Sequence, residues 1–508
     1  MQTTLDDYLR YNVRHFGDRT AVTIDDDALT HAQLARMVAD ARVRIGALIE
    51  PGDRVALWLP NSFAWIASFL AVASLGGVLV PVNTRLTGAE VTVILADAGV
   101  RVLITTPNYR GRNYLDEAQA IGNSLVAAVV AAPGNAAPAE WQVWHGSGAR
   151  GEPMPDKDVF CIQYTSGTTN KPKGVMLTQP LYIHAARYVV HCQRLTPVSS
   201  FMSAAPFFHC SGSMHAVTTC LIGAATLHSV SIWDPEYFVR LVERHRGDTG
   251  HGIFFRDIVA LGAKARQPLS TLKVASDIEP PEFLMRLAQE FGITGISNIY
   301  GMTETGGNLT MWFPHDPFEK RIAGNGRTQA PNEIRIVDPE NGEPRGPNQP
   351  GEIQMRGPTI TPGYYNRPEA NAAAFTADGW FRSGDSGTLS ADGELRYLAR
   401  QRDVIRVGGE NVAPAEIEQA LCEETGLKLI SVVGVPDERL GEVAAAIALA
   451  SDAVDWPNVL DKVRGRLAGF KIPRHVYVTD AMPMTATNKV QRATLRQWIG
   501  QSRLTRVI

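Results

Sequence analysis

The sequence is 508 residues long, and its 49 Lys and Arg residues nearly balance its 52 Asp and Glu residues, for a net charge of −3. This length favours two or more domains, and the near-neutral balance excludes a general attraction to nucleic acid or to anionic membranes. The content of 44% hydrophobic and 20% charged residues is that of an ordinary soluble globular protein.

Features near the N-terminus and the cysteines predict a cytoplasmic protein. Residues 1–7 contain neither a basic region nor an apolar run, so no signal peptide is predicted. The five cysteines form no CxxC pair and are expected to be reduced thiols. The apolar segment 63–82 has the length of a membrane span, but Gly76, Gly77 and Pro81 interrupt it. We therefore expect no membrane span, and instead a buried helix followed by a buried strand.

The first part of the chain alternates amphipathic helical segments with short apolar strands, at residues 54–59, 77–81, 100–105 and 125–130. This alternation predicts an α/β fold with largely parallel sheets. A loop rich in Pro, Gly and Ala then leads to a further strand at 158–164.

From about residue 332, short strands separated by Gly and Pro turns predict a β-rich subdomain. A compact α/β unit follows Arg402, where Pro414 suits a first helical turn and Gly426 suits a helix end. We therefore expect residues 1–401 to form an N-terminal domain and residues 402–508 a C-terminal domain.

The segment that carries the strongest chemical signal reads YTSGTTNKPKG, from Tyr164 to Gly174. A strand ends there, and the chain continues into hydroxyl groups, glycines and two lysines. Flexible backbone N–H groups, hydroxyls and ammonium groups are suited to binding a polyphosphate, although the spacing of a Walker loop is absent. The predicted nucleotide-binding residues of this segment are Thr165, Ser166, Gly167, Thr168, Thr169 and Lys173.

This segment resembles the phosphate-binding signature of the adenylate-forming superfamily of acyl-CoA synthetases, adenylation domains and luciferases. The other motifs of that superfamily follow in order over essentially the whole chain. The resemblance implies an α/β fold with a large N-terminal domain of mixed α/β sheets plus a β-rich subdomain, and a small mobile C-terminal α/β domain. It also implies an AMP-forming acid–thiol ligase that uses ATP, Mg²⁺ and coenzyme A.

The resemblance assigns roles to single residues in the motifs YGMTET and WFRSGD. It implies that the Tyr300 ring packs on adenine, that Thr303 contacts phosphate and that Glu304 helps to hold Mg²⁺, which on nucleotides usually takes one or two protein carboxylates. Asp385 and Arg400 are the implied ribose contacts.

Further roles are implied for the C-terminal part and for the acyl group. Lys489, in TATNKV, resembles the adenylation lysine, Arg402 occupies the hinge position, and Gly408 and Gly409 resemble the loop that borders the pantetheine of coenzyme A. His209, in PFFH, resembles a residue that lines the acyl pocket, and the resemblance also makes it a candidate catalytic residue. The candidate acyl-pocket residues are His209, His251, Phe255, Ala275, Met302 and Gly307, which indicate an apolar acyl group with few charges.

The sequence departs from the superfamily pattern mainly at residues 274–279, which read VASDIE where a longer Gly-Gly-Ala-Pro-Leu loop is usual. Asp277 and Glu279 are thereby predicted beside the site where an anionic acid meets ATP. A carboxylate ~4 Å from another anion costs about 4 kcal/mol at an effective dielectric constant near 20.

Three hypotheses therefore compete. The first is a complete acyl-CoA ligase that makes the CoA thioester of a carboxylic acid through an acyl-adenylate. The second is an adenylation-impaired enzyme that transfers the acyl group from a preformed acyl-AMP to coenzyme A. The third is a carrier-protein-loading adenylating enzyme, or a non-catalytic acyl or nucleotide binder. The sequence leaves open which acid is used and the oligomeric state, a homodimer included.

Overall fold

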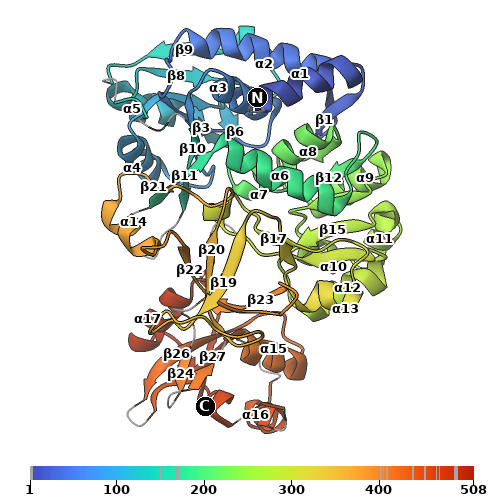
Figure 1. Ribbon diagram of the computed structural model, residues 1–508, viewed down its shortest axis with the longest axis vertical. Coiled ribbons are helices and arrows are strands. Elements are labelled where there is room, and N and C mark those ends of the chain that lie inside the picture. Colours follow the sequence, from blue (N-terminus) through green and yellow to red (C-terminus); the bar gives the residue numbers. More distant parts are fainter. Residues whose placement is uncertain are drawn as a thin grey trace. The chain divides into compact units, whose positions relative to one another are not determined.

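The computed structural model describes residues 4–148, 152–154, 156, 158–165, 172–400, 403, 405–407, 410–412, 414–437, 440–450, 454–464, 466–467, 469–485 and 490–508. The chain divides into two compact units (Figure 1). The first comprises residues 1–334 and 355–381, and the second comprises residues 335–354 and 382–508.

The first unit contains an eight-stranded sheet in the order β21-β11-β10-β4-β3-β5-β8-β9. Its parallel centre consists of β4 (Val78–Pro81), β3 (Arg54–Trp58), β5 (Val100–Thr105) and β8 (Ala128–Ala131), which are almost entirely buried. Continuous apolar strands of this kind are typical of parallel sheets that are covered on both faces.

Helix α3 (Phe63–Ser74) is the apolar segment that raised the question of a membrane span. The Ser62 side chain caps its first turn by accepting from Trp65 N, and the helix is buried almost throughout before the chain enters β4. The predicted buried helix followed by a buried strand is therefore confirmed. Among the described residues, no helix is long and apolar enough to cross a membrane.

The second sheet of this unit has the order β16-β15-β14-β12-β13-β1-β2. Six strands are parallel, and only β2 (Asp27–Thr30) is antiparallel. The carboxyl ends of parallel strands meet at one edge, where ligands of α/β sheets commonly bind. That edge is formed by β12 (Ser200–Met202), β13 (Thr226–Ser229), β14 (Thr249–His251), β15 (Val274–Asp277), β16 (Gly295–Asn298) and β1 (Thr20–Ile24).

Helices surround these sheets, and the largest core cluster combines buried residues of α2, α3 and α6 with residues of both sheets. The helices are α1 (Leu5–Phe16), α2 (His31–Gly46), α4 (Gly88–Ala98), α5 (Tyr114–Leu125), α6 (Gln179–Gln193), α7 (Cys210–Gly212), the π-helical turn η2 (Ser213–Thr218), α8 (Thr219–Gly223), α9 (Pro235–His245), α10 (Phe255–Ala260), α11 (Ala263–Arg266), α12 (Pro281–Phe291), α13 (Phe318–Ala323) and α14 (Pro368–Ala374). The remaining strands of this unit are β6 (Asn108–Tyr109), β7 (Arg112–Asn113), β9 (Gln142–His145), β10 (Val159–Thr165), β11 (Lys173–Thr178), β17 (Thr310–Met311), β18 (Arg327–Thr328) and β21 (Gly363–Tyr364).

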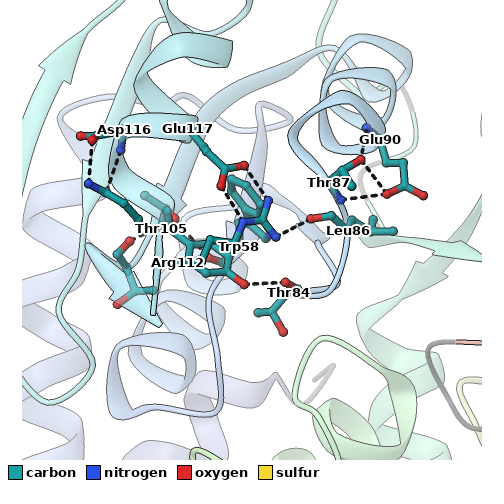
Figure 2. Close-up of polar contacts among 12 residues, drawn as sticks. Trp58, Thr84, Leu86, Thr87, Glu90, Thr105, Arg112, Asp116 and Glu117 are labelled. Atoms are coloured by element: carbon teal, nitrogen blue, oxygen red, sulfur yellow. Dashed lines mark hydrogen bonds and ion pairs between the residues drawn. The ribbon is translucent and has the colours of Figure 1, made fainter. Parts of the chain in front are cut away.

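Arg112 fastens the segment after β4 to helix α5 (Figure 2). Its guanidinium group donates to both Glu117 carboxylate oxygens at 2.6 Å and to the Leu86 carbonyl at 2.8 Å. It also lies 5.0 Å from the centroid of the Trp58 ring. A half-buried bidentate pair of this kind is geometrically specific as well as strong, so it holds the entry to α4 in place.

The second unit contains the predicted β-rich subdomain and the predicted C-terminal α/β unit. A four-stranded sheet has the order β19-β20-β22-β23, and a six-stranded sheet has the order β25-β24-β27-β28-β29 with β26 paired to β27. The elements are β19 (Glu333–Val337), β20 (Gly351–Arg356), β22 (Phe381–Leu389), β23 (Leu395–Arg400), β24 (Ile405–Val407), β25 (Glu410–Val412), α15 (Pro414–Thr425), β26 (Ile430–Asp437), β27 (Gly441–Leu449), α16 (Trp456–Arg464), β28 (His475–Thr479), α17 (Arg492–Gly500) and β29 (Thr505–Arg506).

Candidate active site

The predicted phosphate-binding segment lies between two paired strands. Strands β10 and β11 are antiparallel, and Thr165 and Lys173 form their last register pair. The predicted nucleotide contacts Ser166, Gly167, Thr168 and Thr169, which follow Thr165, lie outside the described residues. The Lys173 ammonium group lies 5.3 Å from the centroid of the Tyr364 ring, a cation–π contact.

Tyr364 joins this hairpin to the predicted metal carboxylate. It pairs with Val175 of β11, and its hydroxyl donates to Glu304 Oε1 at 2.9 Å. The backbone of Glu304 is held as well, because its carbonyl accepts from Thr361 N at 2.7 Å. The structure therefore brings Lys173, Tyr364 and Glu304 together, as a cation, an aromatic hydroxyl and a carboxylate at the base of the predicted phosphate loop.

Sequence reasoning missed Tyr364. Its only signal is the run Gly363-Tyr364-Tyr365 after a predicted strand, and an aromatic residue beside a glycine is common in turns of no special function.

The motif YGMTET forms a tight turn after β16. Tyr300 is 5% exposed, and its backbone pairs with Thr310. A Cβ atom at Gly301 would lie 2.3 Å from the Gly307 carbonyl oxygen, so only glycine fits this close approach. The Met302 carbonyl accepts from Gly307 N at 2.9 Å. Tyr300, Met302 and Gly307 are thus neighbours, with Thr303 beginning the turn Thr303–Thr305.

Asn298, the last residue of β16, is a further candidate that sequence reasoning missed. Its amide Nδ2 donates to the Glu279 carbonyl at 2.8 Å, whereas the buried Oδ1 has no hydrogen-bond partner among the described residues. An unsatisfied buried acceptor costs about 1–3 kcal/mol. This oxygen is therefore suited to accept from a ligand N–H, such as the exocyclic amine of adenine.

The segment 274–279 differs from the shortened loop predicted from the sequence. Residues Val274–Asp277 form strand β15, which lies between β14 and β16 and pairs with both in parallel. Glu279 is neutralised by Arg256, whose Nε and Nη2 donate to its carboxylate at 2.9 Å and 2.5 Å. The repulsion predicted for this carboxylate is therefore offset by an adjacent cation.

Asp277 is the second carboxylate of this segment. Burial, with a further contribution from the nearby Glu279 charge, raises the pKa of Asp277 from 3.8 to about 7, and its Oδ1 accepts from Ile278 N. A carboxyl group that keeps its proton up to this pH repels an incoming anion less than an ordinary aspartate does. The electrostatic argument for impaired adenylation is weaker in the structure than in the sequence.

The raised pKa makes a prediction about stability. Between pH 3.8 and about 7, folded Asp277 holds a proton that the unfolded chain has released, so its contribution to stability is lost as pH rises through that range. Asp277→Asn is therefore expected to unfold ~2–4 °C above the wild type at about pH 8.5, and this difference should shrink towards zero at about pH 4, where the carboxyl of the unfolded wild type also becomes protonated. Thermal unfolding followed by circular dichroism at both pH values measures this, and a difference that is independent of pH would contradict it.

The predicted acyl-pocket histidines belong to one hydrogen-bonded chain at the carboxyl edge of the second sheet. His209 Nδ1 accepts from Ser211 N at 3.2 Å, and Ser211 Oγ lies 3.1 Å from His251 Nε2. His251 Nδ1 lies 3.0 Å from the Ser276 carbonyl oxygen. Burial holds the pKa of His251 well below its usual value of 6.5, so this ring is neutral.

The other predicted pocket residues lie in two places, the hydrophobic core and the turn that follows β16. Ala275 and Phe255 are each 1% exposed and belong to the hydrophobic core that α9, α10 and α12 form with the sheet. The Phe255 ring is therefore accounted for by core packing, whereas Met302 and Gly307 lie in the turn of the YGMTET motif.

Asp385 and Arg400, the predicted ribose contacts, are direct partners in the second unit. They face each other across β22 and β23, and Arg400 Nε lies 3.0 Å from Asp385 Oδ1. The backbone of Asp385 is fixed by donation to Ser383 Oγ at 3.0 Å. A buried carboxylate held beside a half-exposed guanidinium group is suited to accept from vicinal hydroxyls.

Lys489, Gly408, Gly409 and Arg402 lie outside the described residues. The residues flanking Lys489 are firmly held: Met484 pairs with Val490, and Gln491 Nε2 donates to the Met484 carbonyl at 2.8 Å. Arg492 then makes a bidentate contact with the Glu418 carboxylate at 2.7 Å and 2.8 Å.

Comparison with known proteins identifies the family. The family model described as AMP-binding enzyme matches residues 9–365, and the model of the AMP-binding enzyme C-terminal domain matches residues 416–489. The chain therefore belongs to the AMP-binding enzyme family, and the superfamily predicted from its motifs is confirmed.

Several curated relatives are acyl-CoA ligases. A 7a-methyl-1,5-dioxo-octahydroindenyl-propanoyl:CoA ligase from Mycobacterium tuberculosis is 34% identical over 96% of this chain and 97% of its own length. Feruloyl-CoA synthase from an Amycolatopsis species is 33% identical over 95% of this chain and 96% of its own. The predicted enzyme class, an AMP-forming acid–thiol ligase, is confirmed by these relatives.

Solved structures share the fold over nearly the whole chain. o-Succinylbenzoate CoA synthetase from Bacillus subtilis, in complex with its acyl-adenylate intermediate, has a TM-score of 0.82 at 26% identity and covers 96% of this chain and 97% of its own. ATP-bound MatB from Rhodopseudomonas palustris has a TM-score of 0.84 at 25% identity, over 97% of this chain and 99% of its own. The predicted α/β fold class is thereby confirmed.

Proposed function

We propose that this protein activates a carboxylic acid with ATP as an acyl-adenylate and then transfers the acyl group to coenzyme A. The observation that carries the proposal is the cluster of Lys173, Tyr364 and Glu304 at the base of the phosphate hairpin, within a chain whose relatives are CoA ligases. Preorganised charge of this kind accelerates phosphoryl-type transfer without covalent help from the protein.

The two steps place different demands on the protein. In the first, a carboxylate oxygen of the acid attacks the α-phosphorus of ATP and pyrophosphate leaves. Lys173 and, as we propose, Lys489 offset the negative charge that gathers there. Mg²⁺, when bound, would neutralise phosphate charge. The Glu304 carboxylate, which Tyr364 orients, is suited to hold this ion, because nucleotide-bound Mg²⁺ usually takes one or two protein carboxylates.

In the second step the thiol of coenzyme A attacks the acyl carbonyl, and AMP leaves with the bonding electron pair. We propose that residues 402–508 rotate about Arg402 between the steps, so that Lys489 withdraws and Gly408 and Gly409 border the pantetheine. Asp385 and Arg400 would keep the ribose in place throughout. Glycines suit a loop that a ligand passes closely.

The adenylation-impaired alternative rested on the carboxylates of residues 274–279. Its support is reduced, because Glu279 is paired with Arg256 and the pKa of Asp277 is raised to about 7. We therefore expect acid-dependent adenylation to proceed.

A panel of carboxylic acids tests the proposal, with acid-dependent ATP–pyrophosphate exchange and CoA-thioester formation measured separately. For the best acid, the same acyl group is also supplied as synthetic acyl-adenylate. We expect both half-reactions with one acid. Thioester formation from adenylates alone, with no exchange for any acid, would instead establish the adenylation-impaired enzyme. Exchange without thioester formation would indicate a carrier protein as acceptor.

A further inference from the structure

A second histidine, which sequence reasoning did not single out, lies against the predicted acyl pocket. His215 belongs to the π-helical turn η2, and its ring stacks on that of His251 with centroids 3.9 Å apart and planes 20° apart. Its Nε2 lies 3.1 Å from the Gly307 carbonyl oxygen. His215 therefore contacts two predicted pocket residues at once, and π-helical turns are frequent at functional sites.

The hydrogen bonds assign the proton of the His215 ring. A carbonyl oxygen can only accept, so Nε2 of His215 donates to Gly307. In a neutral ring the other nitrogen is an acceptor, and His215 Nδ1 has no partner among the described residues. His251 has partners for both nitrogens, because its Nδ1 lies 3.0 Å from the carbonyl and the hydroxyl oxygens of Ser276 and its Nε2 lies 3.1 Å from Ser211 Oγ.

Burial keeps both rings neutral. The pKa of His215 is lowered to about 4 and that of His251 is lowered well below 6.5, chiefly by desolvation. At neutral pH neither ring of the stacked pair therefore carries a positive charge, and His215 Nδ1 presents a lone pair that has no partner among the described residues.

A second unsatisfied side chain follows Gly307 directly. Asn308 is 1% exposed, as is His215, and within the described part of the chain neither its amide oxygen nor its amide nitrogen has a hydrogen-bond partner. Buried polar groups in native proteins are nearly always hydrogen-bonded. The His215 ring contacts the Gly307 carbonyl through its other nitrogen and Asn308 follows Gly307 in the chain, so these two unsatisfied side chains point to a ligand that satisfies them.

We propose that the acyl subsite beside His215 and Asn308 selects an acid whose acyl part is uncharged and carries a hydroxyl group. This inference rests on the proposed function. A hydroxyl can donate to a lone pair such as that of His215 Nδ1 and accept from an amide N–H such as that of Asn308, so its chemistry suits both side chains. A second carboxylate lacks a proton to donate and would face lone pairs in a buried setting without a cation from either histidine. The apolar acyl group with few charges stays the prediction from the sequence, and we extend it here to a neutral acyl group that carries one hydroxyl.

The test uses hydrolysis-resistant acyl-sulfamoyl adenosines, whose adenosine part binds independently of the tail. Tails of two to six carbons, and phenylpropanoyl tails, are compared as matched sets that end in hydrogen, hydroxyl or carboxylate. We expect calorimetry to show, for the best-fitting length, binding at least about tenfold tighter for the hydroxyl tail than for hydrogen, because sites built for a hydroxyl reject its absence. The carboxylate tail should bind more weakly than either.

The variant His215→Phe keeps a stacking ring without nitrogen atoms and should reduce the hydroxyl preference to less than about threefold. The matched control is His228→Phe, since His228 is also a buried, neutral histidine stacked on another, His245, at 4.2 Å. That control should keep the full preference. If His215→Phe does not fold, Asn308→Leu serves instead, and it should retain or gain thermal stability because it removes an unsatisfied polar group.

Equal binding of hydroxyl and hydrogen tails by the wild type would overturn the inference, as would an unchanged preference in His215→Phe. If no acyl-sulfamoyl adenosine binds at all, the proposed function itself fails and the inference fails with it. If all acyl-sulfamoyl adenosines bind with the same affinity whatever their tail, the hydroxyl preference fails but the proposed function does not. The two failures are therefore distinguishable.

Discussion

Lys489→Ala is expected to slow acyl-adenylate formation by about 10²–10³-fold, while transfer from a supplied acyl-adenylate to coenzyme A stays within about threefold. The lysine is needed only while the acid, ATP and leaving pyrophosphate crowd negative charge together. The preformed adenylate has already lost the carboxylate charge and the pyrophosphate. Pyrophosphate exchange and single-turnover thioester formation, measured with the same acyl group, separate the two effects.

The structure supports a local interpretation of such a result. Lys489 lies in the segment between Met484 and Val490, whose ends are joined by the pairing of these two residues and by the Gln491 side chain. Removal of one side chain therefore leaves the frame around the loop intact. Lys462→Ala is the control, because this exposed lysine on α16 lies 3.8 Å from the Glu424 carboxylate, a long and weak contact. Equal losses in both half-reactions for Lys489→Ala would refute its assignment to adenylation.

Gly409→Val provides the opposite comparison. A β-branched side chain in the predicted CoA-side loop should obstruct the pantetheine, lowering thioester formation by about tenfold or more while exchange is retained. Loss of exchange with normal thioester transfer would show that this loop serves adenylation instead.

Glu304→Gln is the second change with a large expected effect. An amide of the same shape keeps an oxygen for the Tyr364 hydroxyl, which now donates to Glu304 at 2.9 Å, but loses the charge that suits Mg²⁺. Adenylation should fall by about 10²-fold, and the affinity for MgATP should fall with it, whereas binding of AMP, which needs no metal, should change little. Calorimetric titration with MgATP and with AMP measures both affinities.

Two companion variants separate charge from position. Tyr364→Phe keeps the Glu304 charge and removes only its orienting hydroxyl. We expect the affinity for MgATP to fall by about three- to tenfold, which is at or below the lower end of the effects measured for outer-shell partners of metal ligands. Glu319→Gln removes an exposed carboxylate on α13 and should leave both affinities unchanged. Equal weakening of MgATP and AMP binding by Glu304→Gln would show that this residue supports the fold of the site and does not hold a metal.

Much of this protein could be predicted from its sequence, because the informative features are local. The order of the phosphate, YGMTET, ribose and lysine motifs identified the superfamily, and the family models confirmed it. The apolar run before Gly76 and Pro81 was correctly predicted as a buried helix followed by a strand. The register of two neighbouring strands makes Asp385 and Arg400 direct partners, whereas their assignment to the ribose stays a prediction.

Only the tertiary structure decided which residues distant in the sequence are in contact. It also decided which carboxylates are paired with a cation and which have a shifted pKa. Tyr364 reaches Glu304, Arg256 neutralises Glu279, and His215 stacks on His251, although nothing in the spacing of these residues indicates contact. Asp277 and Glu279 looked like two equal anions in the sequence, but one is paired and the pKa of the other is raised to about 7. Motifs and apolar periodicity are set by residues close in the chain, whereas burial and ion pairing depend on long-range strand pairing, which the sequence encodes only through the completed fold.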